Sequence, residues 1–314
     1  MQEQKAATRD GYGKALLELG KQNQNVVALD GDLSDSTRSE YFAKQFPQRF
    51  FSMGIAEQNM IGTAAGLAFS GKIVYASTFA IFSERAYEFV RNVVSRNKLN
   101  VKIAGSHAGI FTGEDGKSAQ AIEDIAAYRA LPDMIVLQPC DSVEAEKMVF
   151  ALAEHKGPSY MRMHRNPAPI IHNSNYRFQI GKAEIIREGK DAVIFATGTL
   201  VYESLKAAKI LKNENIDVYV VNISTLKPLD SELVINLAKK TNFVITAEDH
   251  NVIGGLGSAV AEVLCENYPC LMKRIGLQDI YAESGKPEEL YKKYGLDAES
   301  IAEEVMRLVK SRQD

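Results

Sequence analysis

Short apolar runs rich in Val and Ile alternate with longer segments of helical period along most of the 314 residues. This alternation predicts an α/β fold with parallel sheets and helices on both faces. In the first half the expected strands are 25–30, 50–55, 72–77, 100–105, 134–139 and 159–164, and the expected helices are Ala7–Lys21, Ala56–Ser70, Phe79–Arg96, Gln120–Leu131 and Asp141–His155. In the second half the expected strands are 183–188, 191–197, 217–223, 242–249 and 270–276, and the expected helices are Tyr202–Lys212, Ser231–Lys240 and Ser258–Glu266.

The segment Asn166–Gly181 separates the two runs of alternation, because it is rich in polar turn residues and has no sustained period. We therefore predict two domains, 1–172 and 182–314, each a largely parallel sheet flanked by helices.

The charge pattern argues against two classes of partner. The chain has 37 Lys and Arg against 40 Asp and Glu, a net charge of -3, and no block of like charge. Neither nucleic acid nor an anionic membrane is expected to bind it. The N-terminal residues lack the apolar core of a secretory signal, and no run of about 18 apolar residues is present. We expect a soluble cytoplasmic protein.

Glu57 lies at the junction of two apolar stretches in FSMGIAEQNMIG, Phe51 to Gly62. One interpretation is a carboxylate in the first turn of a helix, where it interacts favourably with the helix dipole. The other is a partly buried acid, whose protonated form burial favours, so that it can share a proton with a heterocyclic nitrogen. The single residue does not decide between them.

Phe79 and Phe82 are three residues apart, so on a helix they would project from one face. They would then either pack into the core or form a flat wall against which a planar ring can stack. Arg85 follows three residues later on the same face and is either a solvated charge or part of that wall.

The segment from Ser106 to Asp124 is rich in glycine and follows a predicted strand. It presents His107, Glu114 and Asp115 before a helix that we expect to begin near Ser118. Loops at the carboxyl ends of parallel strands bind ligands in open α/β sheets, although glycine-rich acidic loops are also ordinary turns.

Four further side chains near predicted element ends, Arg9, Ser36, His107 and Arg165, could together hold an anionic group. Arginine suits phosphate because its planar fork donates two charge-assisted hydrogen bonds. Taken singly, each is also compatible with an ordinary surface position. The glycine loop of His250–Glu262 lacks the rest of a dinucleotide fingerprint, so we interpret it as a tight packing contact.

The chain resembles the C-terminal half of a transketolase in four blocks that occur in the same order. These are MGIAEQNM, STFAIF, GEDG followed by AIEDIAAYRALPDMIVLQPCD, and EDHNVIGGLGSAVAE. More closely, it resembles the separate C-terminal subunit of a split, two-chain transketolase, with a pyrimidine-binding domain followed by the transketolase C-terminal domain.

The resemblance implies a role for each candidate residue. Glu57 would hydrogen-bond the aminopyrimidine ring of thiamine diphosphate, Phe82 would stack on that ring with Phe79 beside it, and Asp32 would lie at the cofactor's edge. Arg9, Ser36 and Arg165 would bind a sugar phosphate, His107 would reach the same end of the substrate, and Asp115 would hydrogen-bond a donor hydroxyl. His107 is expected to act in catalysis together with Glu57.

The sequence departs from the family pattern at two positions. Transketolases usually carry a histidine where this chain has Ala119, and single-chain members often have an aromatic residue where Arg85 stands. The first departure implies that another group substitutes for the imidazole, that the substrate differs, or that the chain was altered. The second removes the aromatic third wall that the family pattern would give the pyrimidine pocket, although Arg85 is kept among the residues expected to contact the cofactor.

A larger gap concerns the cofactor's diphosphate, which thiamine enzymes hold through Mg²⁺ with a GDG segment and a later Asn. Asp30-Gly31-Asp32 has the wrong order and lies in the wrong domain, so no residue of this chain is assigned to the metal. An N-terminal transketolase subunit is expected to supply that part of the site, in an α2β2 heterotetramer.

The resemblance thus implies transfer of a two-carbon ketol unit from a ketose phosphate to an aldose phosphate. Three alternatives stay open: the beta subunit of a 2-oxo acid dehydrogenase, a 1-deoxyxylulose-5-phosphate synthase, and a non-catalytic subunit that only binds a partner. The phosphate-binding set favours transketolase over the other two enzymes, and Ala119 keeps the non-catalytic alternative open.

Overall fold

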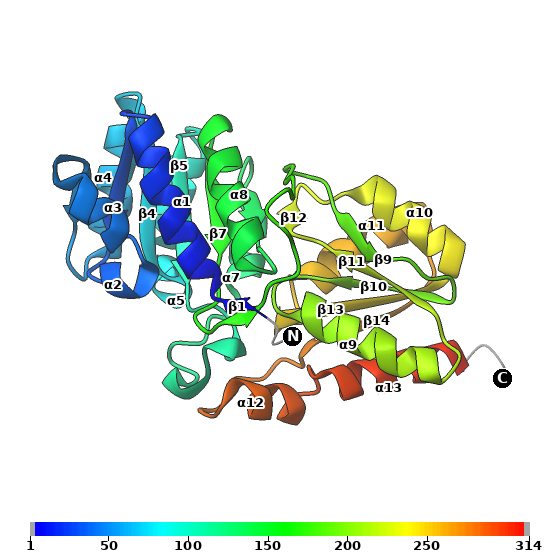
Figure 1. Ribbon diagram of the computed structural model, residues 1–314. Helices are drawn as coiled ribbons and strands as arrows, with labels where there is room; N and C mark the ends of the chain where they lie inside the picture. The colour runs from blue at the N-terminus through cyan, green and yellow to red at the C-terminus, as the bar shows by residue number, and fades with distance from the viewer. Residues whose placement is uncertain (1–3, 311–314) are drawn as a thin grey trace.

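The computed structural model describes residues 4–310 and contains two main sheets, one in each half of the chain. Figure 1 shows the two sheets side by side, each between layers of helices, which confirms the α/β class. Among the described residues, no helix has the length and apolar character needed to cross a membrane.

The first sheet has the strand order β12-β6-β7-β5-β4-β2-β3. Its strands are β2 (Val26–Asp30), β3 (Phe50–Ser52), β4 (Ile73–Phe79), β5 (Val101–Ser106), β6 (Ile135–Leu137), β7 (Ser159–Arg162) and β12 (Thr225–Lys227). All neighbours are parallel except β12, which comes from the second half of the chain and pairs antiparallel with β6. A short ribbon of β1 (Lys5–Ala6) and β8 (Ala168–Pro169) joins the N-terminus to the linker.

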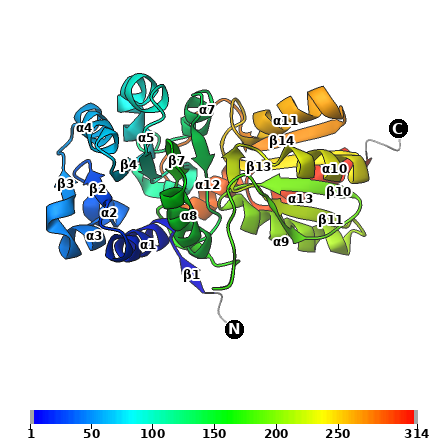
Figure 2. The ribbon, with the colours of Figure 1, turned by 90° about the horizontal axis from the view of Figure 1, so that it is seen from above.

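Helices cover both faces of this sheet, with α1, α3 and α8 on one side and α4, α5 and α7 on the other (Figure 2). The helical elements are α1 (Thr8–Gln22), α2 (Ser34–Thr37), α3 (Glu40–Gln45), η1 (Pro47–Arg49), α4 (Glu57–Phe69), α5 (Ala80–Ser83), η2 (Glu84–Ala86), α6 (Tyr87–Phe89), η3 (Val90–Ser95), η4 (Ile110–Asp115), α7 (Asp124–Arg129) and α8 (Ser142–Glu154). Asp141 caps α8 by accepting from the backbone N–H of Glu144, as the capping pattern in the sequence predicts.

Two predicted helices of this half differ from the structure. The expected helix Phe79–Arg96 is broken: Phe79 is the last residue of β4, and the chain then passes through α5, η2, α6 and the π-helical η3. Phe79 joins the strand because it pairs with Ser106 of β5 across the sheet. The expected helix Gln120–Leu131 is shortened to α7, and no helix begins near Ser118.

The second sheet has the order β14-β13-β10-β11-β9, in which only β9 is antiparallel. Its strands are β9 (Glu184–Arg187), β10 (Ala192–Ala196), β11 (Val218–Asn222), β13 (Phe243–Asn251) and β14 (Leu271–Leu277), and its helices are α9 (Leu200–Asn213), α10 (Ser231–Thr241), α11 (Leu256–Asn267), α12 (Pro287–Lys293) and α13 (Ala298–Lys310). In Figure 1, α10 and α11 lie on one side of this sheet and α9 and α13 on the other.

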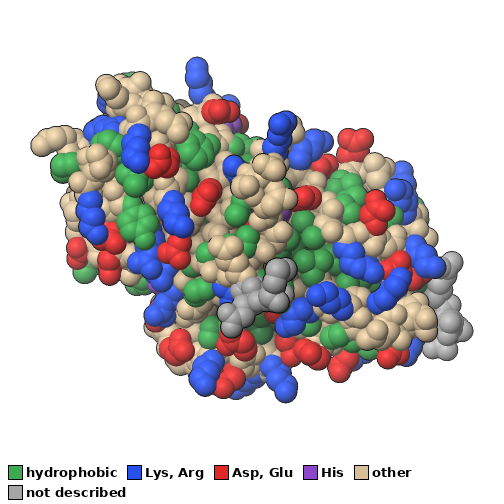
Figure 3. Space-filling model, in the orientation of Figure 1, with side chains coloured by type: hydrophobic (Ala, Val, Ile, Leu, Met, Phe, Trp, Pro, Cys, Tyr) green, Lys and Arg blue, Asp and Glu red, His purple; other side chains and the backbone are tan. Residues whose placement is uncertain are grey.

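The two halves share one hydrophobic cluster, in which Ile125 and Leu131 of the first half join Leu226 and Leu256 of the second. The glycine loop after β13 lies in this contact: a Cβ on Gly254 would stand 2.4 Å from the Cβ of Ala126 on α7. Arg129 donates to the carbonyl oxygen of Gly254. The loop therefore packs one half against the other, as predicted. Outside this contact, acidic and basic side chains are interspersed over the face drawn in Figure 3.

Candidate active site

A cavity of about 630 Å³ opens at the carboxyl ends of β2, β4, β5 and β7, the edge where open parallel sheets bind ligands. We call it the anion cavity. Its lining residues are Arg9, Asp35, Ser36, Arg38, Phe79, His107, Asp115, Ala119 and Arg165. The structure thus brings together the four residues predicted to hold an anion, although Arg9 and Arg165 are far apart in the chain. It adds Arg38 and Asp35, which were not predicted from the sequence.

The arginines of the anion cavity are held in place by hydrogen bonds. Arg9 donates from Nη1 to the carbonyl oxygen of Ser36 at 2.8 Å, while its Nε is buried and has no hydrogen-bond partner. Arg38 donates to Asp10 at 2.8 Å, and Arg165 pairs with Asp115 at 2.8 Å. Burial and the neighbouring charge of Arg38 lower the pKa of Arg9. An anion in the cavity would relieve this repulsion and give the unpartnered Nε an acceptor.

His107 lies between the arginines and the aromatic side chains. It follows β5 with a φ of 60°, and its Nδ1 is 2.9 Å from the hydroxyl of Ser106. Burial, followed by the charges of Arg9 and Arg165, lowers the pKa of His107 to about 3. The imidazole is therefore neutral at pH 7 and offers the cavity a hydrogen bond without a further positive charge.

Phe79 stacks with both Phe82 and His107, with ring centroids 5.5 Å and 3.7 Å away and interplanar angles of 12° and 20°. The prediction that the two phenylalanines share one helix face is wrong, because Phe79 ends β4 and Phe82 lies in α5. The strand-to-helix turn nevertheless places the rings almost parallel. Phe79, which lines the anion cavity, is thus stacked with Phe82 and with His107.

Glu57 is the first residue of α4 and is only 1 % exposed. Its Oε2 is 3.2 Å from Nη1 of Arg85, but this contact lacks hydrogen-bond geometry, so the buried oxygen has no hydrogen-bond partner. Arg85 is about half exposed. A buried acceptor left open in this way is costly unless a ligand or a partner chain supplies a donor.

Two other predicted positions have simpler surroundings. Asp32 is exposed, follows β2 with a φ of 67°, and does not line the anion cavity. Ala119 does line the anion cavity, and it presents only a methyl group there.

A buried polar network that the sequence did not predict surrounds Arg162 and Asp124. Arg162 is fully buried at the end of β7 and pairs with Asp124, whose carboxylate also accepts from Tyr160 at 2.6 Å. Burial and the nearby charge of Asp124 raise the pKa of Glu84 to about 8, and one oxygen of Glu84 has no hydrogen-bond partner. The sequence gives little signal for this network, because its members lie in apolar runs or scattered turns.

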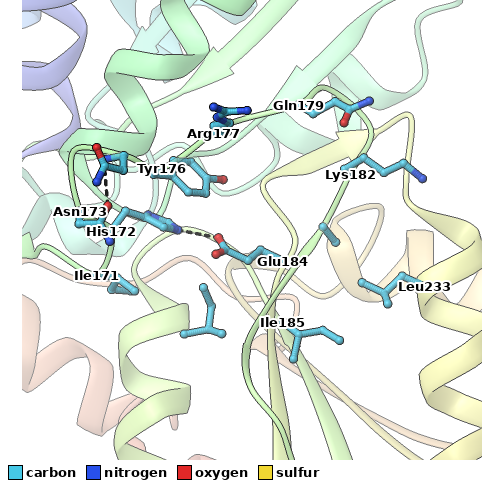
Figure 4. Close-up of a pocket in the computed structure, with 13 residues that line it drawn as sticks. Ile171, His172, Asn173, Tyr176, Arg177, Gln179, Lys182, Glu184, Ile185 and Leu233 are labelled. Carbon is cyan, nitrogen blue, oxygen red and sulfur yellow. Dashed lines mark hydrogen bonds and ion pairs between the residues drawn. The ribbon is translucent and has the colours of Figure 1, made fainter.

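A second cavity, of about 850 Å³, lies along the linker between the halves (Figure 4). His172 stands on one side of it, 2.9 Å from Asp141 and 2.8 Å from Glu184, and so ties α8 to β9. Cys140, Asp141 and His172 are close enough to hold a metal ion, but Asp141 already accepts from the backbone N–H groups of Ile171 and His172. We interpret this cluster as structural.

The His172 cluster predicts a pH dependence of stability. Although burial opposes its charge, hydrogen bonds to Asp141 and Glu184 raise the pKa of His172 to about 10. Its stabilising contribution is therefore complete below about pH 6.5, the ordinary value, and is lost as the pH rises towards 10. The difference in free energy of unfolding between wild type and His172→Gln should shrink from pH 7 to pH 10 in denaturant titrations.

A matched control is His155→Gln. Burial lowers the pKa of His155, so this histidine is neutral from pH 7 to pH 10, and the effect of the substitution on the free energy of unfolding should not change over this range. A His172→Gln difference that stays constant from pH 7 to pH 10 would rule out a charged bridge.

The fold and the anion cavity define an α/β protein with a positively charged site for a ligand at the carboxyl edge of a parallel sheet. Two family models match it: the transketolase pyrimidine-binding domain over residues 4–169 and the transketolase C-terminal domain over residues 181–301. The chain therefore belongs to the transketolase family. Membership of this family implies thiamine diphosphate and a divalent metal as cofactors.

Individual relatives agree with this assignment. A protein of Methanocaldococcus jannaschii described as a transketolase C-terminal section is 51% identical over 96% of each chain. Human transketolase is 39% identical over 97% of this chain but only 49% of its own length, so the chain spans about half of that enzyme. A solved structure described as a split gene transketolase, inactive beta4 tetramer, superposes with a TM-score of 0.91 at 48% identity, covering 97% of this chain and 98% of the other.

Proposed function

We propose that this chain is the C-terminal subunit of a two-chain transketolase. With an N-terminal partner subunit in an α2β2 assembly, it transfers a two-carbon ketol unit from a ketose phosphate to an aldose phosphate. The observation that carries the proposal is the match in length: the chain covers nearly all of the archaeal C-terminal section and of the split-gene structure, but half of human transketolase. The other half would carry the residues for Mg²⁺ and the cofactor's diphosphate.

The residues around Glu57 fit the pyrimidine end of thiamine diphosphate. Glu57 presents a buried oxygen without a hydrogen-bond partner, and Phe79 and Phe82 present stacked rings nearby. Glu57 would hold a proton at the ring nitrogen, Phe82 would support the ring face, and Arg85 and Asp32 would lie at its edge. When bound, the cofactor supplies the nucleophilic carbon and the electron sink for ketol transfer.

The residues of the anion cavity fit the phosphate end of the substrate. Arg9, Arg165 and the hydroxyl of Ser36 would bind the phosphate, and neutral His107 would hydrogen-bond the same end of the sugar. Asp115, now paired with Arg165, would accept from a donor hydroxyl. Binding the phosphate at the far end orients the reacting carbonyl, which lowers the entropic part of the barrier.

Removal of one cavity arginine should raise KM selectively. Arg9→Ala in the assembled complex is expected to raise KM for a ketose phosphate about 30-fold, the loss of roughly 2 kcal/mol from a hydrogen bond to a charged group. KM for the corresponding unphosphorylated ketose should change less than about threefold, and steady-state kinetics with both donors measures the difference. Lys14→Ala, an exposed cation on the same helix, is the matched control.

A substrate assay of the complex with its partner, thiamine diphosphate and Mg²⁺ tests the proposal itself. Ketol transfer between sugar phosphates, with no release of carbon dioxide from pyruvate, supports it. Turnover of pyruvate without ketol transfer would instead assign the chain to a 2-oxo acid dehydrogenase or a deoxyxylulose phosphate synthase. Cofactor binding with no turnover of either kind would assign it to a non-catalytic subunit.

A further inference from the structure

The loop that carries Asp115 is held from both halves of the molecule. From the first half, Asn166 donates to the carbonyl oxygen of Phe111 at 2.7 Å. From the second half, η4 lies against α12, seen at the lower centre of Figure 1. The loop's position therefore depends on the second half, which contributes no residue to the anion cavity lining.

Asp249 of β13 contacts the loop directly through its side chain. It is 2 % exposed, and its two carboxylate oxygens accept from the backbone N–H of Ile110 at 2.9 Å and of Phe111 at 3.0 Å. Tyr291 donates to the same carboxylate at 3.1 Å and is itself hydrogen-bonded to Thr199. The carboxylate thus spans two successive amides of η4 in a fixed geometry.

The backbone at Gly109, next to η4, lies against the side chain of Asp249. Gly109 has a φ of 72°, and a Cβ at this position would stand 2.2 Å from Oδ2 of Asp249. Only glycine combines this backbone conformation with such a close approach. The contact has no room for another side chain.

The location of Asp249 in the second sheet explains the contact. The last paired residues of β10 and β13 are Ala196 and Ala247, and Asp249 follows them at the carboxyl edge of the sheet. In this sheet β10 lies between β13 and β11, so the order of the strands reverses at this point. Open α/β sheets bind ligands at such a point. Here the Asp249 carboxylate instead accepts from two backbone N–H groups of the other half.

We propose that Asp249 is a positioning residue for substrate binding: it fixes residues 109–115 so that Asp115 and, next to the loop, His107 face the anion cavity. The inference rests on the proposed function for its kinetic consequence. It adds a role for the C-terminal half, whose carboxylate sets the affinity for the phosphorylated substrate without touching it.

Asp249→Asn tests the proposal because the amide nitrogen would face one of the two loop N–H groups. In the assembled complex, KM for a ketose phosphate should rise about tenfold while kcat changes less than twofold. Inorganic phosphate should bind about tenfold more weakly in calorimetry, and the amide protons of Ile110 and Phe111 should exchange faster.

The matched control is Glu248→Gln, on the adjacent residue of the same strand. Glu248 is also buried and also accepts from two backbone N–H groups, but these belong to Leu256 and Gly257 at the start of α11. The Glu248→Gln variant should lower the melting temperature without changing KM or phosphate binding. Equal effects of the two variants on KM, or no effect of Asp249→Asn, would overturn the proposal.

Two further readouts keep the test decisive. If Asp249→Asn does not fold, Gly109→Ala displaces the loop from the same carboxylate and should give the same rise in KM; a normal KM would again overturn the proposal. If the wild-type complex shows no ketol transfer, the proposed function fails, and phosphate binding and amide exchange alone then decide the role of Asp249.

Discussion

Glu57→Gln is expected to lower the kcat/KM of ketol transfer by the assembled complex about a thousandfold. Glutamine has nearly the same shape, but it cannot take up or release a proton, and general acid–base residues typically contribute 10²–10⁴-fold. Steady-state kinetics of the complex with saturating cofactor measures the loss.

The fold should survive this substitution. Among the described residues, the ion pair recorded for Glu57 is with half-exposed Arg85, and glutamine keeps the shape of the side chain while it removes a buried charge. Melting temperature and binding to the partner subunit should therefore match wild type. Glu88→Gln, an exposed acid nearby in α6, is the control for charge. If kcat/KM of the Glu57→Gln complex is within tenfold of wild type, Glu57 does not act as the acid–base residue.

The largest stability effect is expected at Arg162. Arg162→Met leaves the buried carboxylate of Asp124 without its cation, and it removes the hydrogen bonds from Arg162 to the carbonyl oxygens of Ala121 and Asp249. Breaking a buried pair on one side typically costs about 3–5 kcal/mol in free energy of unfolding. Denaturant unfolding of the chain measures this cost.

The double variant Arg162→Met with Asp124→Leu should recover part of the loss, because the Asp124 carboxylate is then no longer left buried without its cation. Lys21→Met, which breaks an exposed pair with Glu18, should cost less than about 1 kcal/mol. An Arg162→Met cost no larger than that of Lys21→Met would mean that Asp124 is neutral or hydrated in the folded protein.

The sequence predicted the fold where periodicity is strong. Strands such as β2 and β10 are buried on both faces and appear as continuous apolar runs, so they were found at close to their true positions. The short helix α2 was missed because four residues cannot display a helical period. The helix α13 was also not predicted. It is amphipathic, and the spacing of its buried residues Ile301, Ala302 and Val305 is a helical signal that the sequence does carry.

The sequence could not predict contacts that depend on tertiary structure. β12 completes the first sheet although it belongs to the second half, since pairing with β6 is decided by the packing of the two halves. The break in the predicted helix after Phe79 follows from pairing with β5. Local secondary-structure propensity predicts neither of these two strand pairings.

The anion cavity was partly predictable for a general reason. Loops after neighbouring parallel strands meet at one edge, which is why Ser36, His107 and Arg165, each near a predicted element end, could be proposed to hold one anion together. Arg38 was missed because it follows a helix of one turn that the sequence did not reveal. Asp249 was missed because its partners are backbone amides of the other half, which carry no side-chain signature.

The most direct test of a site shared by two chains is to measure cofactor binding and ketol transfer by this subunit alone, by its N-terminal partner alone, and by their equimolar mixture. Thiamine diphosphate with Mg²⁺ should bind tightly, and ketol transfer should occur, only in the mixture. Substantial turnover by this subunit alone would contradict a shared site.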